Sequence, residues 1–193
     1  MKNLMRSIIS VSLSLAVLPI NSPHLPSQLG EEIYVKIIQK LLITENRESD
    51  PFTVMREESL GELKINLSAQ QVIQLLGNPT QKGQVEFWAG DALYHQYWYY
   101  PNQGITLSMA SETEKGQQNI GFIKLVSPSR LPTKRGIKIG SSIEEVSLAY
   151  AKEKYKDMSI PDQTFMAGSI YGGLIFTFDK GRVIEIFLGA AAE

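Results

Sequence analysis

Two segments of the sequence, 74 positions apart, repeat the same signal for the start of a helix, and this pair constrains the fold most. The first runs from Leu63 to Gly77 (LKINLSAQQVIQLLG) and the second from Ile137 to Ala151 (IKIGSSIEEVSLAYA). Each contains a serine with Gln or Glu three positions later. This is the capping box, in which each side chain accepts a hydrogen bond from the backbone N–H of the other residue. Apolar residues at helical spacing follow each box, so each segment predicts a helix with one buried face.

The two predicted helices differ at their ends. Gly77 and Pro79 end the first helix, because glycine suits the C-terminal cap and proline cannot continue a helix. The second pattern continues through KEKY and predicts a helix that ends near Ser159–Pro161. Asn66 and Gly140 precede the boxes and tolerate left-handed backbone, which suits a sharp turn into each helix.

Segments with strand character follow both helices. They are Gln84–Trp88, Tyr94–Tyr100, Ile105–Ser111 and Ile120–Val126 after the first, and Gln163–Tyr171, Leu174–Phe178 and Val183–Leu188 after the second. The second group has hairpin-turn signals at Gly172-Gly173 and Asp179-Lys180-Gly181. Strands joined by short turns indicate antiparallel sheets and an α+β fold. We therefore expect two tandem repeats, residues 59–128 and 131–193, forming two sheet units side by side with a helix on one face of each.

The N-terminal residues have the composition of a targeting segment. Lys2 and Arg6 precede an apolar run from Ser7 to Ile20, which is shorter than the roughly 20 residues of a comfortable membrane span. Residues 1–22 are predicted to be a signal peptide or an uncleaved N-terminal anchor, and a buried helix of a cytoplasmic protein is the third possibility. The first two predict an extracytoplasmic location, periplasmic or secreted.

Residues 30–50 are predicted to be a helical extension and a linker. Glu31 to Ile43 has apolar residues at helical spacing and acidic residues at its start, where they favour the helix dipole. We expect this helix to pack on the main domain rather than to act on a membrane. The polar stretch TENRESDP that follows predicts the linker.

Composition excludes several classes of function. The chain has 19 basic and 20 acidic residues, and this near-neutrality lacks the electrostatic footprint of a nucleic-acid binder. It has no cysteine, which excludes disulfides, thiolate metal sites, cysteine nucleophiles and a lipid-modified cysteine anchor. Membrane contact is therefore expected only through an uncleaved N-terminal segment. A basic stripe of Lys134, Arg135 and Lys138 is expected to be a solvated edge rather than a partner site.

The sequence contains no recognisable catalytic motif. The two histidines, His24 and His95, are far apart in the chain, and no cysteine or second histidine stands near His95 to complete a metal site. No serine-nucleophile motif in a suitable context and no glycine-rich phosphate loop is present. Glu144 and Glu145 are explained by helix capping. We expect no enzymatic activity and no cofactor or metal.

Three segments resemble a known fold. They are Asn66–Pro79, with the pattern N-x-S-x-x-x-V-x-x-L-L-G-x-P, the aromatic strand Trp98-Tyr99-Tyr100, and Phe122–Val126. They resemble the SmpA/OmlA-type outer-membrane-assembly lipoproteins and the secreted β-lactamase inhibitor proteins, which have two copies of the fold in tandem. The resemblance covers most of Ser59–Leu188. It implies a scaffold whose sheet face binds other proteins, and it does not identify the partner.

The aromatic strand Tyr94–Tyr100 (YHQYWYY) is the strongest candidate for a binding surface. Alternate residues of a strand point to opposite faces of a sheet, and a single layer of helices covers only one face. By resemblance and size, Trp98 and Tyr100 are assigned to the helix-covered core.

The open face is then predicted to present the other set of side chains. The predicted binding residues are Trp88, His95, Tyr97 and Tyr99. Tyrosine combines a large contact area with a polar tip and is enriched where proteins bind partners. The alternative interpretation is that these aromatic residues only stabilise the sheet by cross-strand pairing.

The expected function is that of an exported, non-enzymatic scaffold that recognises a protein or an envelope component through this open aromatic face. The first alternative is a membrane-anchored accessory or structural envelope protein. The second is a hydrolase with a carboxylate site that the sequence does not reveal.

Overall fold

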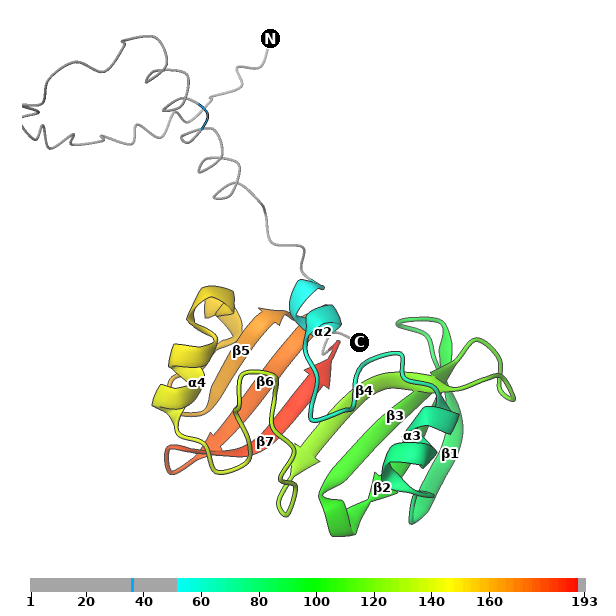
Figure 1. The fold of residues 1–193 in the computed structure, drawn as a ribbon. Helices are drawn as coiled ribbons and strands as arrows, with labels where there is room; N and C mark the ends of the chain where they lie inside the picture. Colours follow the sequence, from blue (N-terminus) through cyan, green and yellow to red (C-terminus); the bar gives the residue numbers. More distant parts are fainter. Residues whose placement is uncertain (1–35, 37–51, 191–193) are drawn as a thin grey trace, which may run out of the picture. The chain divides into compact units, whose positions relative to one another are not determined.

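The computed structural model describes Lys36 and residues 52–190 (Figure 1). The predicted targeting segment lies outside these residues, and of the predicted helical extension only Lys36, which is helical, lies within them. The chain divides into two compact units, residues 1–47 and 48–193, and every element named below belongs to the second. Within the described residues, no helix combines the length and apolar character needed to cross a membrane.

Seven strands form one antiparallel sheet, which confirms the predicted α+β class. Its strand order is β1-β2-β3-β4-β7-β6-β5. The strands are β1 (Gln81–Trp88), β2 (Leu93–Tyr100), β3 (Ile105–Ser111), β4 (Asn119–Val126), β5 (Thr164–Ser169), β6 (Gly172–Asp179) and β7 (Arg182–Gly189). Pairing of β4 with β7 joins the two predicted groups of strands. They therefore form one continuous sheet rather than two separate ones.

Within residues 52–190, three short α-helices and three 3-10 turns accompany the sheet. They are α2 (Thr53–Glu57), α3 (Ala69–Leu76), α4 (Ile143–Ala149), η1 (Pro101–Gln103), η2 (Ala151–Glu153) and η3 (Lys156–Met158). Both predicted capping boxes are formed. The Ser68 hydroxyl accepts from the Gln71 N–H at 3.3 Å, and the Ser142 hydroxyl accepts from the Glu145 N–H at 3.2 Å. In each box the Gln71 or Glu145 side chain also accepts a hydrogen bond from the backbone N–H of the serine.

The second helix is shorter than predicted. It ends at Ala149, and Tyr150 leaves the helical conformation, whereas the sequence pattern predicted an end near Ser159–Pro161. The segment that follows pairs with the edge strand β5 instead. The Tyr155 N–H donates to the Met166 carbonyl at 2.8 Å, and the Ser159 hydroxyl accepts from the Met166 N–H at 3.1 Å. Backbone pairing at this edge replaces the last turns of the predicted helix.

One predicted hairpin turn is also displaced. Gly172 and Gly173 belong to β6, and the turn from β5 is formed by Ile170-Tyr171. A Cβ atom on Gly172 would lie 3.1 Å from the Met55 sulfur, so glycine here permits close packing of α2 rather than a turn. The other predicted hairpin turn, after Asp179, is confirmed.

The hydrophobic core lies between the sheet and the helices, all of which cover the same face (Figure 1). Val72 of α3 and Val146 of α4 are fully buried against it. Trp98 and Tyr100 are 1% and 3% exposed, and the Tyr100 hydroxyl donates to the Gly77 carbonyl at the end of α3. Their predicted place in the helix-covered core is confirmed. Burial raises the pKa of Tyr100 to about 12.

Candidate functional site

The candidate site begins on the sheet face opposite the helices. In β2, alternation places His95, Tyr97 and Tyr99 on this face, as predicted, and Trp88 of the neighbouring β1 lies with them. Two phenylalanines from other strands extend the set. We call these six residues the aromatic row: Trp88, His95, Tyr97, Tyr99, Phe122 and Phe187. Of the described elements, no helix lies over this face (Figure 1).

The rings of the row come from four strands and contact one another over β3, which lies between β2 and β4. The Tyr97 ring is stacked 6.0 Å from Tyr99 and meets Phe122 of β4 edge-on at 5.7 Å. Phe122 in turn lies 5.0 Å from Phe187 of β7. Tyr97, Tyr99 and Phe187 are half-buried, so the middle of the row is a fixed but accessible aromatic surface.

His95 differs from the prediction because its side chain is buried. It is 5% exposed, and the Trp88 ring stacks on it at 3.8 Å with an interplanar angle of 11°. Its Nε2 lies 2.8 Å from Asp91 Oδ2 and its Nδ1 lies 2.7 Å from the Ser108 hydroxyl. Asp91 also accepts the Leu93 N–H at 3.0 Å. The imidazole therefore links the β1–β2 turn to the middle of β3, and it is not a free contact residue.

The Asp91–His95–Ser108 connection has the residue types of a hydrolase triad, in which the histidine activates the serine. A nucleophile must reach its substrate, but Ser108 is fully buried in the centre of β3. In this conformation the connection holds the hairpin turn and satisfies two buried polar groups. The sequence gives little sign of it, because Ser108 meets His95 only through the β2–β3 register.

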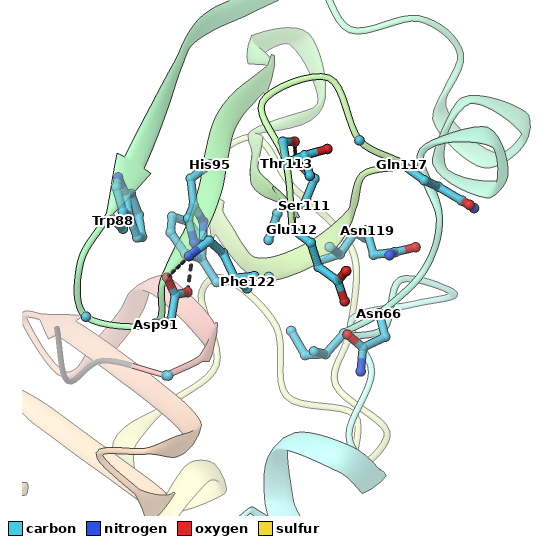
Figure 2. A pocket seen from close by; sticks show the side chains of 18 of the residues that line it. Asn66, Trp88, Asp91, His95, Ser111, Glu112, Thr113, Gln117, Asn119 and Phe122 are labelled. Atoms are coloured by element: carbon cyan, nitrogen blue, oxygen red, sulfur yellow. Dashed lines mark hydrogen bonds and ion pairs between the residues drawn. The ribbon is translucent and has the colours of Figure 1, made fainter.

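One end of the aromatic row opens into a groove of about 930 Å³ (Figure 2). It lies between the β1–β2 turn and the loop of residues 112–118 that joins β3 to β4. In Figure 2, Trp88, His95 and Asp91 stand on one side and Glu112, Asn119 and Asn66 on the other, with Phe122 between them. Trp88, His95 and Phe122 thus belong to both the row and the groove.

Local backbone geometry positions the polar side of the groove. Asn66 adopts the left-handed conformation that the sequence predicted, with φ 68°, and its N–H donates to the Ile120 carbonyl at 2.8 Å. This turn starts α3 and brings Asn66 beside β4. The loop of residues 112–118 supplies Glu112 and other polar groups. The prediction of binding residues did not include this loop, because its polar composition gave no sign that it lines a cavity.

The groove is acidic. Among the described residues that line it, the ionisable ones are Asp91, Glu112 and His95, with no lysine or arginine. Asp91 pairs with His95 yet stays 45% exposed. The exposed Glu112 carboxylate makes no ion pair within the part of the chain that the structure describes.

A second polar cluster lies on the helix side of the molecule, around Arg135. Its guanidinium donates to both Glu153 oxygens at 2.9 and 3.0 Å and to the Ala149 carbonyl at the end of α4. It also lies 4.5 Å from the centre of the Tyr150 ring, and its Nε is 3.5 Å from the buried Glu58 carboxylate. All three residues of the basic stripe are exposed, as expected for a solvated edge, and Arg135 in addition holds this cluster together.

Charge and burial set the ionisation of this cluster. The hydrogen bond from Arg135 lowers the pKa of Glu153, and the same bond raises the pKa of Arg135. Burial raises the pKa of the Tyr150 hydroxyl. The cluster ties the linker before the second helix to the end of that helix, which is a structural role.

Among residues 52–190 and Lys36, no group of three or more His, Cys, Asp or Glu side chains could hold a metal ion. A comparison of the chain with protein-family models, curated proteins and solved structures finds no match.

Proposed function

We propose that the protein is a non-enzymatic scaffold that recognises another protein through its open sheet face. This is supported most directly by the successive ring contacts on a face that no described helix covers. They link Tyr97, Tyr99, Phe122 and Phe187. Half-buried aromatic side chains held by their neighbours lose little conformational freedom on binding, and such residues supply much of the energy of protein interfaces.

The surroundings of the row favour a protein partner. Lys124 and Glu185 form an ion pair at 3.4 Å on the same face, next to Phe187 in the sheet register. The surface therefore combines an aromatic centre with a charged border, which is the usual arrangement of a protein interface.

Two further parts of the proposal concern origin and location. The shared capping boxes of α3 and α4, each followed by antiparallel strands, favour two tandem repeats within the continuous sheet. The N-terminal sequence favours export, so the partner is expected in the periplasm or outside the cell, as a protein or protein-containing component of the envelope.

The decisive experiment uses the full chain with a Tyr97→Ala/Tyr99→Ala double variant. Proteins that co-purify from an envelope extract are identified, and the dissociation constant of the main partner is then measured with purified components. We expect the double variant to bind at least about tenfold more weakly, because each truncated tyrosine is a central contact.

A matched control changes the same face away from the row. Thr177 of β6 is half-buried on that face and is paired with Glu185 rather than with a ring of the row, so a Thr177→Ala variant should keep the partner. Urea unfolding of both variants establishes that each is folded. Equal partner binding by the wild type and the tyrosine variant would refute the proposal.

A further inference from the structure

We infer that the groove beside the aromatic row binds a lysine or arginine side chain of an extended polypeptide, so that the partner presents a basic segment there. This inference rests on the proposed function and deepens it, because the groove shares Trp88, His95 and Phe122 with the row. It identifies the chemistry of the partner, which the row alone does not.

The size and lining of the groove fit a short peptide segment. Its volume of about 930 Å³ lies at the upper end of the roughly 300–1,000 Å³ typical of ligand sites. Trp88, Phe122 and Ile65 supply apolar surface. A lysine or arginine side chain can pack its aliphatic stem on such surface while its charged end remains at the polar side.

The negative charge of the groove favours a positively charged ligand. Asp91 and Glu112 stand on opposite sides of it (Figure 2). Among the described lining residues no lysine or arginine offsets them, and His95 bonds only Asp91 of the two. The Glu112 carboxylate is exposed without an intramolecular ion pair in the described chain. A cation placed between these two groups gains attraction from both, whereas an anionic ligand such as a phosphate or an acidic peptide is repelled.

The groove and the row are continuous, which favours a polypeptide over a small free cation. Phe122 contacts Tyr97 in the middle of the row and also lines the groove. An extended chain that packs on the half-buried Tyr97 and Tyr99 can therefore place a side chain in the groove with no gap between the two surfaces.

The test titrates the full-length protein with three capped tripeptides: Ac-Leu-Lys-Leu-NH2, its norleucine analogue and its glutamate analogue. The norleucine peptide has nearly the same apolar stem as lysine without the charge. The indole N–H signals of the two tryptophans report the site, because Trp88 lines the groove and Trp98 is buried on the other face. A Trp88→Phe variant assigns the signals.

We expect the lysine peptide to shift the Trp88 signal to saturation and to leave Trp98 unchanged. The norleucine peptide should bind about tenfold more weakly, and the glutamate peptide should not bind measurably. Affinity for the lysine peptide should fall as salt is added. Equal binding of the lysine and norleucine peptides, or no shift of Trp88 with any peptide, would overturn the inference.

Replacing single carboxylates by amides of the same shape shows which carboxylate attracts the lysine peptide. Glu112→Gln should weaken lysine-peptide binding about three- to tenfold. Glu114→Gln, which changes a carboxylate of the same loop that does not line the groove, is the matched control and should have a smaller effect. Asp91→Asn is informative only beside these variants, because Asp91 also holds His95 and Leu93. Equal losses in Glu112→Gln and Glu114→Gln would show that general charge, not the groove, attracts the peptide.

The two proposals can fail separately. The Tyr97→Ala/Tyr99→Ala variant should still bind the lysine tripeptide, because neither tyrosine lines the groove. If the tripeptide binds as expected and no protein partner depends on the tyrosines, the proposed function fails and the cation site stands. If a partner depends on the tyrosines but not on Glu112, the proposed function stands and the cation site fails.

Discussion

The two faces of strand β2 contain the same kind of side chain in different surroundings. Trp98 and Tyr100 point toward the helices and are 1% and 3% exposed, whereas Tyr97 and Tyr99, one position away in each case, are half-buried on the opposite face. The backbone register is the same for both sets. The difference teaches that the helix layer, not residue type, separates the buried Trp98 and Tyr100 from the accessible Tyr97 and Tyr99.

The faces also differ in their extent along the sheet. On the covered face, apolar side chains continue through the β4–β7 pairing, where Leu125 and Ile186 are opposite each other and both fully buried. On the open face, the aromatic row ends at Phe187, and β6 presents Ile175 and Thr177 instead. The core is therefore a property of the whole sheet, whereas the candidate binding surface belongs mainly to the strands that follow α3.

The largest expected contrast between the faces is in stability. Trp98→Ala should lower the free energy of unfolding by about 3–5 kcal/mol, because it leaves a large cavity in the core. Tyr99→Ala should cost about 1 kcal/mol or less, since its ring is already partly hydrated. Urea unfolding at constant m-value measures both. Similar losses in the two variants would mean that the open face is packed as tightly as the core.

This contrast was largely predictable from the sequence. Alternation in YHQYWYY, together with the resemblance, assigned Trp98 and Tyr100 to the core, and the capping boxes fixed the starts of both helices. All seven predicted strands are present, with boundaries within about three residues. These features depend on local spacing and on which side chains the backbone repeat brings to one face.

The features that were not predicted depend on contacts between distant parts of the chain. The β4–β7 pairing that unites the sheet leaves no local signal. The burial of His95 requires Trp88, Asp91 and Ser108 to meet around it, and the groove requires a loop after β3 to face the β1–β2 turn. The early end of the second helix follows from competition by the β5 edge, which helix periodicity cannot reveal.

The next effect concerns the buried hydrogen bond between His95 and Ser108 on the open face. Ser108→Ala should lower the free energy of unfolding by about 1–3 kcal/mol, because His95 Nδ1 loses its hydrogen bond to the Ser108 hydroxyl in a buried position. Thr106→Ala is the control, since Thr106 lies on the same face of β3 and is half-exposed. A loss no greater than that of the control would show that water replaces the serine hydroxyl at little cost.

The third prediction compares the two helices that cover the core. Ser68→Ala and Ser142→Ala should each cost about 1 kcal/mol, because each removes the acceptor of its capping box. Ser147→Ala, within α4, is the control and should not destabilise the protein, because alanine is the better helix former. Thermal unfolding of the three variants measures these differences in stability. A large cost in one cap and none in the other would mean that the two helices contribute unequally to the stability of the core.

The smallest expected effect is electrostatic and again contrasts the two sides of the sheet. On the helix side, Arg135 holds the pKa of Glu153 below its usual value. A lowered pKa in the folded state stabilises the protein above the unfolded pKa, about 4.3, and this contribution disappears as the pH falls through the folded value. The pair is partly exposed, so Glu153→Gln should cost at most about 1 kcal/mol at pH 7 and less than that at pH 3.

The Lys124–Glu185 pair provides the comparison on the open face. Its distance of 3.4 Å is longer than the 2.9 Å of the Arg135–Glu153 pair, and it lacks the second hydrogen bond that the guanidinium makes. Glu185→Gln should therefore change stability at pH 7 less than Glu153→Gln does, as measured by urea unfolding at both pH values. If the cost of Glu153→Gln is as large at pH 3 as at pH 7, the side chain stabilises the protein by packing rather than by charge. If Glu185→Gln costs as much as Glu153→Gln at pH 7, the border of the aromatic row is as firmly fixed as the cluster at the end of α4.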